Sequence, residues 1–139
     1  LLPILAGTLV GSVVSVVSVF VLSRAMNLDW TVLAALLPKS VTLAIAMPLA
    51  ESLGGLSAVT VVAVSITGIG GAVILPPFLK LLKIRDPIAT GIAIGTASHA
   101  VGTSRALELG ETEGAMSSLA IGITGLMTAV IITIISVFL

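Results

Sequence analysis

Cysteine is absent from this 139-residue sequence, and charged residues are scarce. Without cysteine the chain can form neither disulfides nor thiolate metal sites. Six basic and six acidic residues give a net charge of zero, so the sequence offers no support for a nucleic-acid partner. Only 9% of the residues are charged, compared with about 25% in soluble domains. The shortage of charge argues against a soluble domain.

The sequence instead contains long apolar runs. Hydrophobic residues make up 58% of the chain, and the mean hydropathy is +1.32. Residues 1–22, 56–79 and 115–139 contain no charged side chain. At about 1.5 Å per residue, each run is long enough as a helix to exceed the roughly 30 Å hydrocarbon core of a bilayer. These runs predict an all-α integral membrane protein surrounded by lipid.

Two further apolar segments, residues 30–53 and 87–107, are interrupted in the middle. The interruptions in the first segment are Pro38, Lys39, Ser40, Thr42 and Pro48. An unsatisfied peptide group in hydrocarbon costs several kcal/mol, so a broken segment survives only where it faces protein or a water-filled cavity. Ionisable groups at membrane depth are rare and usually functional. We therefore predict two discontinuous membrane segments, with a substrate site at the break that contains Lys39.

The basic residues predict how the segments cross the membrane. Arg24 and the cluster at residues 80–85 lie in alternate connections, whereas the connections between them contain only Arg105. Because basic connections stay in the cytoplasm, this pattern predicts about five transmembrane segments with the C-terminus inside. Re-entrant hairpins are the alternative. They would place Arg24 and the 80–85 cluster on opposite sides.

An internal repeat of about 57 residues supports this architecture. A shift of 57 residues superimposes Ile-Thr-Gly at residues 66–68 on the same triplet at residues 123–125. The same shift places Thr42 in the first break on His99 in the second. Internal repeats with paired broken helices are a recurring plan of secondary transporters. Each unit is expected to contain one discontinuous segment followed by one continuous helix.

Small residues predict where helices touch. Gly7, Gly11 and Ser15 recur at four-residue spacing, as do Gly91 and Gly95. This spacing lets helix backbones approach closely in a membrane, where lipid supplies no hydrophobic force between helices. We interpret these residues as packing positions.

Several short runs carry a more specific signal. They are residues 38–42 (Pro-Lys-Ser-Val-Thr), 44–47, 53–55, 95–103 (Gly-Thr-Ala-Ser-His-Ala-Val-Gly-Thr), 106–108, 110–115 and 117–120. Together they resemble the LrgB/CidB family of integral membrane proteins, whose members extend further at the N-terminus. The resemblance implies that residues 1–139 are a single LrgB-like transmembrane domain, the C-terminal part of a longer chain.

The resemblance implies two alternative functions. The first is a membrane carrier or pore for small monocarboxylates such as pyruvate, glycolate and glycerate. The second is an antiholin-like subunit that modulates murein hydrolase export and lysis through a small LrgA/CidA-like membrane partner. The implied location is the bacterial cytoplasmic membrane, or the plastid inner envelope if the source is a plant. The sequence leaves a homo-oligomer open.

The chemistry of the two breaks suits a carboxylate. The predicted substrate-binding residues are Lys39, Ser40, Thr42, Thr96, Ser98, His99 and Thr103. Lys39 supplies charge, while hydroxyl groups and the N-termini of the half-helices supply hydrogen bonds. His99, with an ordinary pKa near about 6.5, could couple transport to protons. The alternative is a neutral histidine bonded between helices.

An enzyme is not expected. Ser98 and His99 are adjacent, so their side chains diverge on a helix, and no acidic residue accompanies them. One histidine without cysteine also makes a poor metal site. We therefore predict no catalytic residue, no cofactor and no metal.

Overall fold

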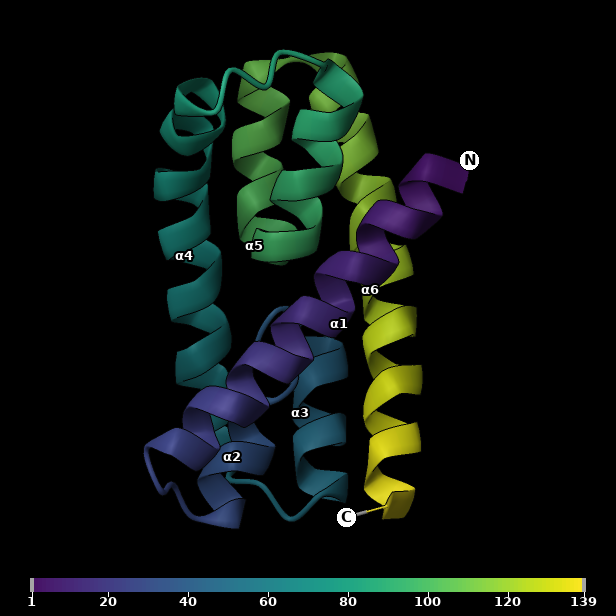
Figure 1. Ribbon diagram of the computed structural model, residues 1–139. Coiled ribbons are helices and arrows are strands. Elements are labelled where there is room, and N and C mark those ends of the chain that lie inside the picture. The colour runs from purple at the N-terminus through teal and green to yellow at the C-terminus, as the bar shows by residue number, and fades with distance from the viewer. Residues whose placement is uncertain (1, 139) are drawn as a thin grey trace.

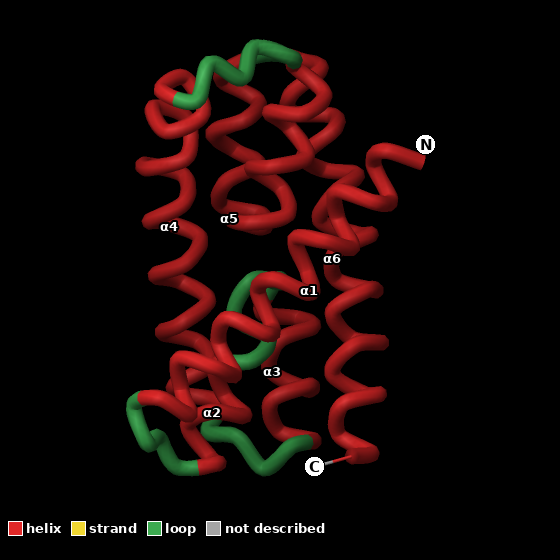
Figure 2. Tube along the Cα trace, in the orientation of Figure 1, coloured by secondary structure: helices red, strands yellow, loops and turns green. Residues whose placement is uncertain are grey.

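The computed structural model describes residues 2–138, and these residues form six α-helices and no strand. The helices are α1 (Leu2–Ala25), α2 (Trp30–Leu36), α3 (Leu43–Ser52), α4 (Ser57–Leu81), α5 (Pro87–Leu109) and α6 (Glu111–Phe138). Figure 1 shows them as an elongated bundle, with the loops of Figure 2 at its two ends and at one point in its middle. The all-α prediction is confirmed.

Three of these helices, α1, α4 and α6, are long and apolar enough to cross a membrane. They contain 24, 25 and 28 residues, and their most apolar windows have mean hydropathies of 2.3, 2.2 and 2.3. They coincide with the three charge-free runs of the sequence, of which Leu1 and Leu139 lie outside the described residues. Their outer faces are covered with exposed valine, isoleucine and leucine, as lipid contact requires.

The first interrupted segment folds as a helical hairpin, here called the first hairpin (residues 30–52). Helix α2 ends just before Pro38, whose ring removes a backbone donor, and α3 begins at Leu43. The two helices return to the same end of the bundle, where the indole Nε1 of Trp30 donates to the carbonyl of Leu53 at 2.9 Å. The turn between them, residues 37–42, is the tip of this hairpin and lies in the middle of the bundle.

Helix α5 is also a hairpin, the second hairpin (residues 87–109). It starts with Pro87 at its first position, and the carboxylate of Asp86 accepts from the backbone N–H of Ala89 at 2.7 Å. His99 interrupts the helix with φ 42° and ψ −140°. Residues 87–98 run toward the middle of the bundle, and residues 100–109 run back. Residues 96–99 are the tip of this hairpin.

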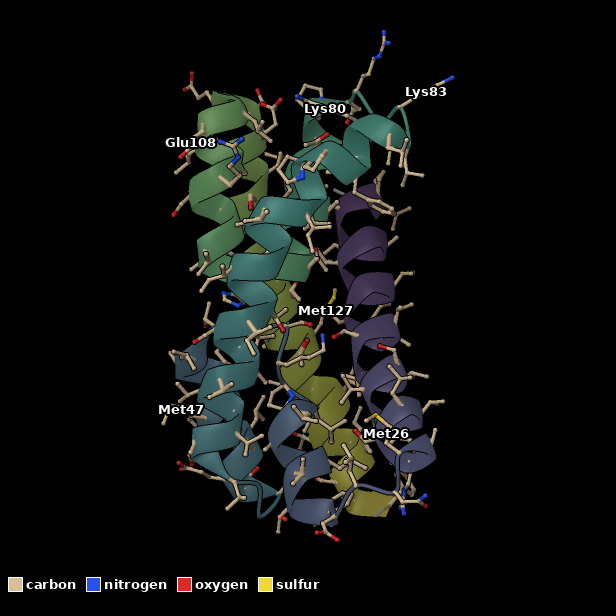
Figure 3. All side chains as sticks on the ribbon, turned by 90° about the vertical axis from the view of Figure 1, so that its left-hand side faces the viewer. Met26, Met47, Lys80, Lys83, Glu108 and Met127 are labelled. Carbon is tan, nitrogen blue, oxygen red and sulfur yellow. The ribbon has the colours of Figure 1, made fainter. Side chains whose placement is uncertain are left out.

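The prediction of about five transmembrane segments is wrong for this structure, and the hairpin alternative describes it. Both interrupted segments turn back in the middle, which leaves the three long helices as candidate spans. Figure 3 shows Lys80, Lys83 and Glu108 at one end of the bundle and Met26 near the other. A stretch of 23 residues has enough length for one crossing or for two half-crossings, so composition alone did not separate the two folds.

Glycines on α5 allow the second hairpin to pack against α6. A Cβ atom at Gly91 would overlap the carbonyl oxygen of Glu113, and one at Gly95 would overlap that of Ser117. The two backbones therefore touch, as the four-residue spacing of these glycines predicted. This contact fixes residues 87–98 alongside the first half of α6.

The hairpin fold predicts a specific labelling pattern. Single cysteines at Leu82 and Thr112, both exposed, should react with a membrane-impermeant maleimide from the same side, because the second hairpin returns to the end at which it starts. A cysteine at the exposed Met26 should react only from the other side. The natural absence of cysteine provides a clean background. Labelling of Leu82→Cys and Thr112→Cys from opposite sides would restore the five-span arrangement.

Candidate functional site

A cavity of about 660 Å³ lies between α1 and residues 86–97 of the second hairpin, and it reaches Lys39 and Ser40 at the tip of the first. Its lining in the middle of the bundle comprises Lys39 and Ser40 from the first tip, Thr96 and Ala97 from the second, and Gly11 and Ser15 from α1. The remaining lining residues are apolar except for Asp86, which lies at the start of α5. The two tips, 57 residues apart in the sequence, thus share one cavity.

Lys39 provides the positive charge in this cavity, whose lining also includes the carboxylate of Asp86. Among the described residues that line it, Lys39 is the only base. The ammonium group of Lys39 donates to Ser40 Oγ at 3.4 Å, and Ser40 Oγ is 2.6 Å from Ser15 Oγ on α1. Within residues 2–138 the sole salt bridge joins Arg105 to Glu108, so Lys39 has no carboxylate partner there. An ammonium has three donors, and those left over can bind an anion.

Thr96 is the polar residue of the second tip that reaches the cavity. Its hydroxyl accepts from Thr124 Oγ1 of α6 at 3.4 Å, and its methyl group packs against Gly11 of α1. Gly11 permits this contact, because a Cβ atom there would lie 2.5 Å from the Thr96 methyl. α1 therefore contacts both tips, through Gly11 and Ser15.

His99 fixes the second tip to α4. The histidine is 4% exposed, and its Nε2 lies 2.9 Å from the carbonyl oxygen of Val64. Its ring lies over Gly68, where a Cβ atom would come within 2.5 Å of Cε1. The positive φ of His99 is a conformation that non-glycine residues rarely adopt. This arrangement matches a histidine bonded between helices, the second of the two roles considered for it.

Ser98 points toward α4. Its side chain is fully buried, its Oγ has no hydrogen-bond partner among residues 2–138, and a Cβ atom at Gly71 would overlap it.

Thr103 is bound within the bundle, since its hydroxyl donates to the carbonyl of His99 at 3.0 Å and lies 2.7 Å from Ser117 Oγ. Thr42 is the residue before α3, and its side chain makes no capping hydrogen bond.

The structure thus divides the predicted substrate-binding residues into two groups. Lys39, Ser40 and Thr96 line the cavity, whereas Thr42, Ser98, His99 and Thr103 do not. Sequence reasoning treated Ser15 as a packing residue and did not single out Ala97. The spacing of Ser15 from Gly11 showed that it faces another helix, but its bond to Ser40 is visible only in the fold.

Alanine substitutions at the adjacent residues Gly70 and Gly71 test how α4 packs against the tip of the second hairpin. Gly71→Ala should lower thermal stability in detergent, because overpacking against Ser98 costs about 1–3 kcal/mol. Gly70→Ala should be neutral or stabilising, since no atom lies within 4 Å of a Cβ there and alanine favours a helix by about 1 kcal/mol. Equal melting temperatures for the two variants would contradict this packing.

Three apolar helices and two hairpins that meet around a largely apolar cavity with a few polar side chains define a polytopic α-helical membrane protein. The profile of the LrgB-like family matches residues 1–138, and the chain belongs to the LrgB-like family. It is an integral membrane protein, and its family is non-enzymatic, in agreement with the prediction that it is not an enzyme.

Curated relatives come from bacteria. The chain is 42% identical over 129 residues to proteins named antiholin-like protein LrgB from Bacillus cereus (strain B4264) and Bacillus anthracis (strain CDC 684 / NRRL 3495). The alignment covers 93% of this chain and 56% of each relative, so the chain spans about half the length of the relatives it matches. No solved structure matches the chain.

Proposed function

We propose that this chain forms the substrate-binding part of a membrane carrier or pore for small monocarboxylates of the pyruvate, glycolate and glycerate class. The observation that supports the proposal is the cavity between the two tips, with Lys39 free of a carboxylate partner among the described residues. Its volume of about 660 Å³ falls within the roughly 300–1,000 Å³ of small-molecule sites. A carrier requires a site of this kind at mid-membrane depth.

In this proposal α1, α4 and α6 span the bacterial cytoplasmic membrane, and the hairpins enter it from opposite sides as re-entrant segments. Their tips then lie near the bilayer midplane, away from lipid. Non-helical backbone is tolerated at that depth only against protein or water, and the cavity supplies such a place for residues 37–42. Ionisable groups at this depth are usually functional, and anion binding accounts for the ammonium of Lys39.

Uptake of radiolabelled pyruvate and glycolate into liposomes tests this function. The full-length protein that contains this chain, reconstituted alone, should take up both anions faster than protein-free liposomes. Excess unlabelled pyruvate should compete, and the neutral analogue pyruvamide should not, because Lys39 selects a negative charge. Uptake equal to that of protein-free liposomes for both anions would reject the carrier.

The names of the relatives favour a second function, that of an antiholin-like subunit acting on a small LrgA/CidA-like membrane partner. Contact between helices, not an anion site, would then carry the activity. Lys39→Ala should leave lysis control unchanged in cells that express the partner, because Lys39 lines the cavity. Lysis control that is lost with Lys39→Ala would instead link the antiholin-like behaviour to the anion site.

A further inference from the structure

The boundaries of the helices repeat at the same interval as the sequence. The first hairpin starts at residue 30 and the second at residue 87, while they end at residues 52 and 109. Both pairs of hairpin boundaries are separated by 57 residues, the shift that superimposes the Ile-Thr-Gly triplets, and each hairpin is followed by a long helix, α4 or α6. Residues 30–81 (unit one) and 87–138 (unit two) are therefore built alike.

The two units point in opposite directions. The first hairpin opens at the end of the bundle opposite to that at which the second opens, and α4 and α6 run antiparallel (Figure 1). This is the arrangement of an inverted repeat, in which corresponding residues are related by a two-fold axis in the membrane plane. Contacts between the units should then occur in reciprocal pairs.

Corresponding glycines of the two long helices each contact a side chain from the hairpin of the other unit. Gly68 of unit one receives the ring of His99 from the second hairpin, and Gly125 of unit two receives the Cδ1 of Ile45 from the first. These glycines are 57 residues apart. The two glycines thus correspond by the shift of 57 residues, whereas the side chains that they contact do not, because that shift places Thr42 on His99.

The cavity contains the corresponding residues of both tips. Lys39 and Ser40 on one wall correspond, by the shift of 57 residues, to Thr96 and Ala97 on the other. The two walls are equivalent in position and different in chemistry. Only the first carries a positive charge, because threonine occupies the position that corresponds to Lys39.

We propose that the pair Lys39 and Thr96, related by the inverted repeat, sets the charge of the anion that the cavity accepts. The proposal rests on the proposed monocarboxylate function. One ammonium neutralises one carboxylate, whereas the second carboxylate of malonate or succinate would meet Thr96 and be buried without a counter-charge. An unpaired buried charge is strongly unfavourable. A lysine at position 96 would supply the missing partner.

Changing the charges on the two walls tests the pair. Thr96→Lys should raise malonate uptake relative to pyruvate uptake at least about tenfold, the scale of a desolvated charge pair. Lys39→Thr should lose pyruvate uptake, and the double variant Lys39→Thr/Thr96→Lys should recover it, because the charge returns at the corresponding position. If Lys39 served only in folding, Thr96→Lys would not restore pyruvate uptake to the Lys39→Thr protein.

Thr96 is buried against Gly11, so a lysine there must displace neighbours. Ala97→Lys is therefore tested in parallel, because Ala97 is exposed and lines the same wall. Ala100→Lys is the matched control, being exposed near the same tip but outside the cavity lining. It should leave the malonate-to-pyruvate ratio unchanged. An unchanged ratio in well-folded Ala97→Lys or Thr96→Lys protein overturns the proposal.

Crosslinking tests the geometry without transport. Cysteines at Ser40 and Ala97 should react with a short bis-maleimide to form an intramolecular link, and a Ser40 and Ala100 pair should react far less. Absence of the Ser40–Ala97 link overturns the shared cavity. If the link forms and wild-type protein takes up no pyruvate, the monocarboxylate function fails while the repeat stands. If wild type takes up pyruvate and neither lysine variant changes the ratio, the charge pair alone fails.

Discussion

Replacing Lys39 with alanine should reduce pyruvate uptake to the level of protein-free liposomes while the protein remains inserted. Lys39 is the only base in the described cavity lining, and its ammonium has no carboxylate partner within residues 2–138. Loss of a partner for a desolvated charge costs about 2–5 kcal/mol, which corresponds to a fall in affinity of more than tenfold. Uptake of radiolabelled pyruvate at fixed protein density measures the change.

A control variant and the energetics of insertion make this result interpretable. Lys80→Ala removes an exposed base at the end of α4 and should transport normally. Removal of the charge at Lys39 also favours insertion by up to roughly 3 kcal/mol, so poor membrane insertion is not expected. Normal pyruvate uptake by well-inserted Lys39→Ala protein would mean that the cavity binds no anion through this side chain.

His99→Val should destabilise the second tip strongly and abolish uptake with it. Valine at φ 42° is strained, because its β-branched side chain is poorly tolerated at positive φ. The variant also loses the bond to the Val64 carbonyl and the contact with Gly68. Strain and lost packing together predict a loss of roughly 3 kcal/mol or more in stability. Thermal unfolding in detergent measures it.

Glycine at the same position separates the two causes. His99→Gly removes the ring but adopts the backbone conformation without strain, so its stability should lie between wild type and His99→Val. Ala100→Val is the neighbouring control at an exposed position and should have a small effect. If His99→Gly and His99→Val are equally unstable, the bond and the packing dominate and the backbone contributes nothing measurable.

The membrane helices could be predicted from the sequence because their signal is local. Residues 1–22, 56–79 and 115–139 lack charge over a length that only a spanning helix needs, and α1, α4 and α6 follow them closely. The breaks were local too, since a proline or a polar cluster in an apolar run is visible without tertiary contacts. Pro38 and His99, which lie at the two tips, could therefore be assigned to the breaks from local sequence alone.

Whether the interrupted segments cross the membrane or turn back within it could not be predicted in the same way. Residues 87–109 are long enough for a full span. The contact that folds this segment back, between Gly102 and Ile94 across the break at His99, is visible only in the folded structure. Counting basic residues assumed that each segment crosses, which placed Arg24 and the 80–85 cluster on one side. The structure places them at opposite ends.

The direction of each tip side chain also depends on distant residues. Ser98 was predicted to bind the substrate, and His99 either to do so or to bond between helices. Gly68 and Gly71 leave room for both side chains on the side of α4. Thr96, predicted in the same run as a substrate-binding residue, lines the cavity. The sequence singled out residues 95–103 but could not assign the faces of this segment, because the glycines that accommodate its side chains lie in a different helix.

Protection of Ala97→Cys from alkylation tests the anion cavity most directly. Ala97 is exposed and lines the cavity beside Thr96, so a cysteine there should react with a small maleimide. Pyruvate should slow this reaction, pyruvamide should not, and protection should disappear when Lys39→Ala is added. A cysteine at Ala100, outside the lining, should be unaffected throughout. If pyruvate leaves the alkylation rate of Ala97→Cys unchanged, the cavity between the two tips is not a monocarboxylate site.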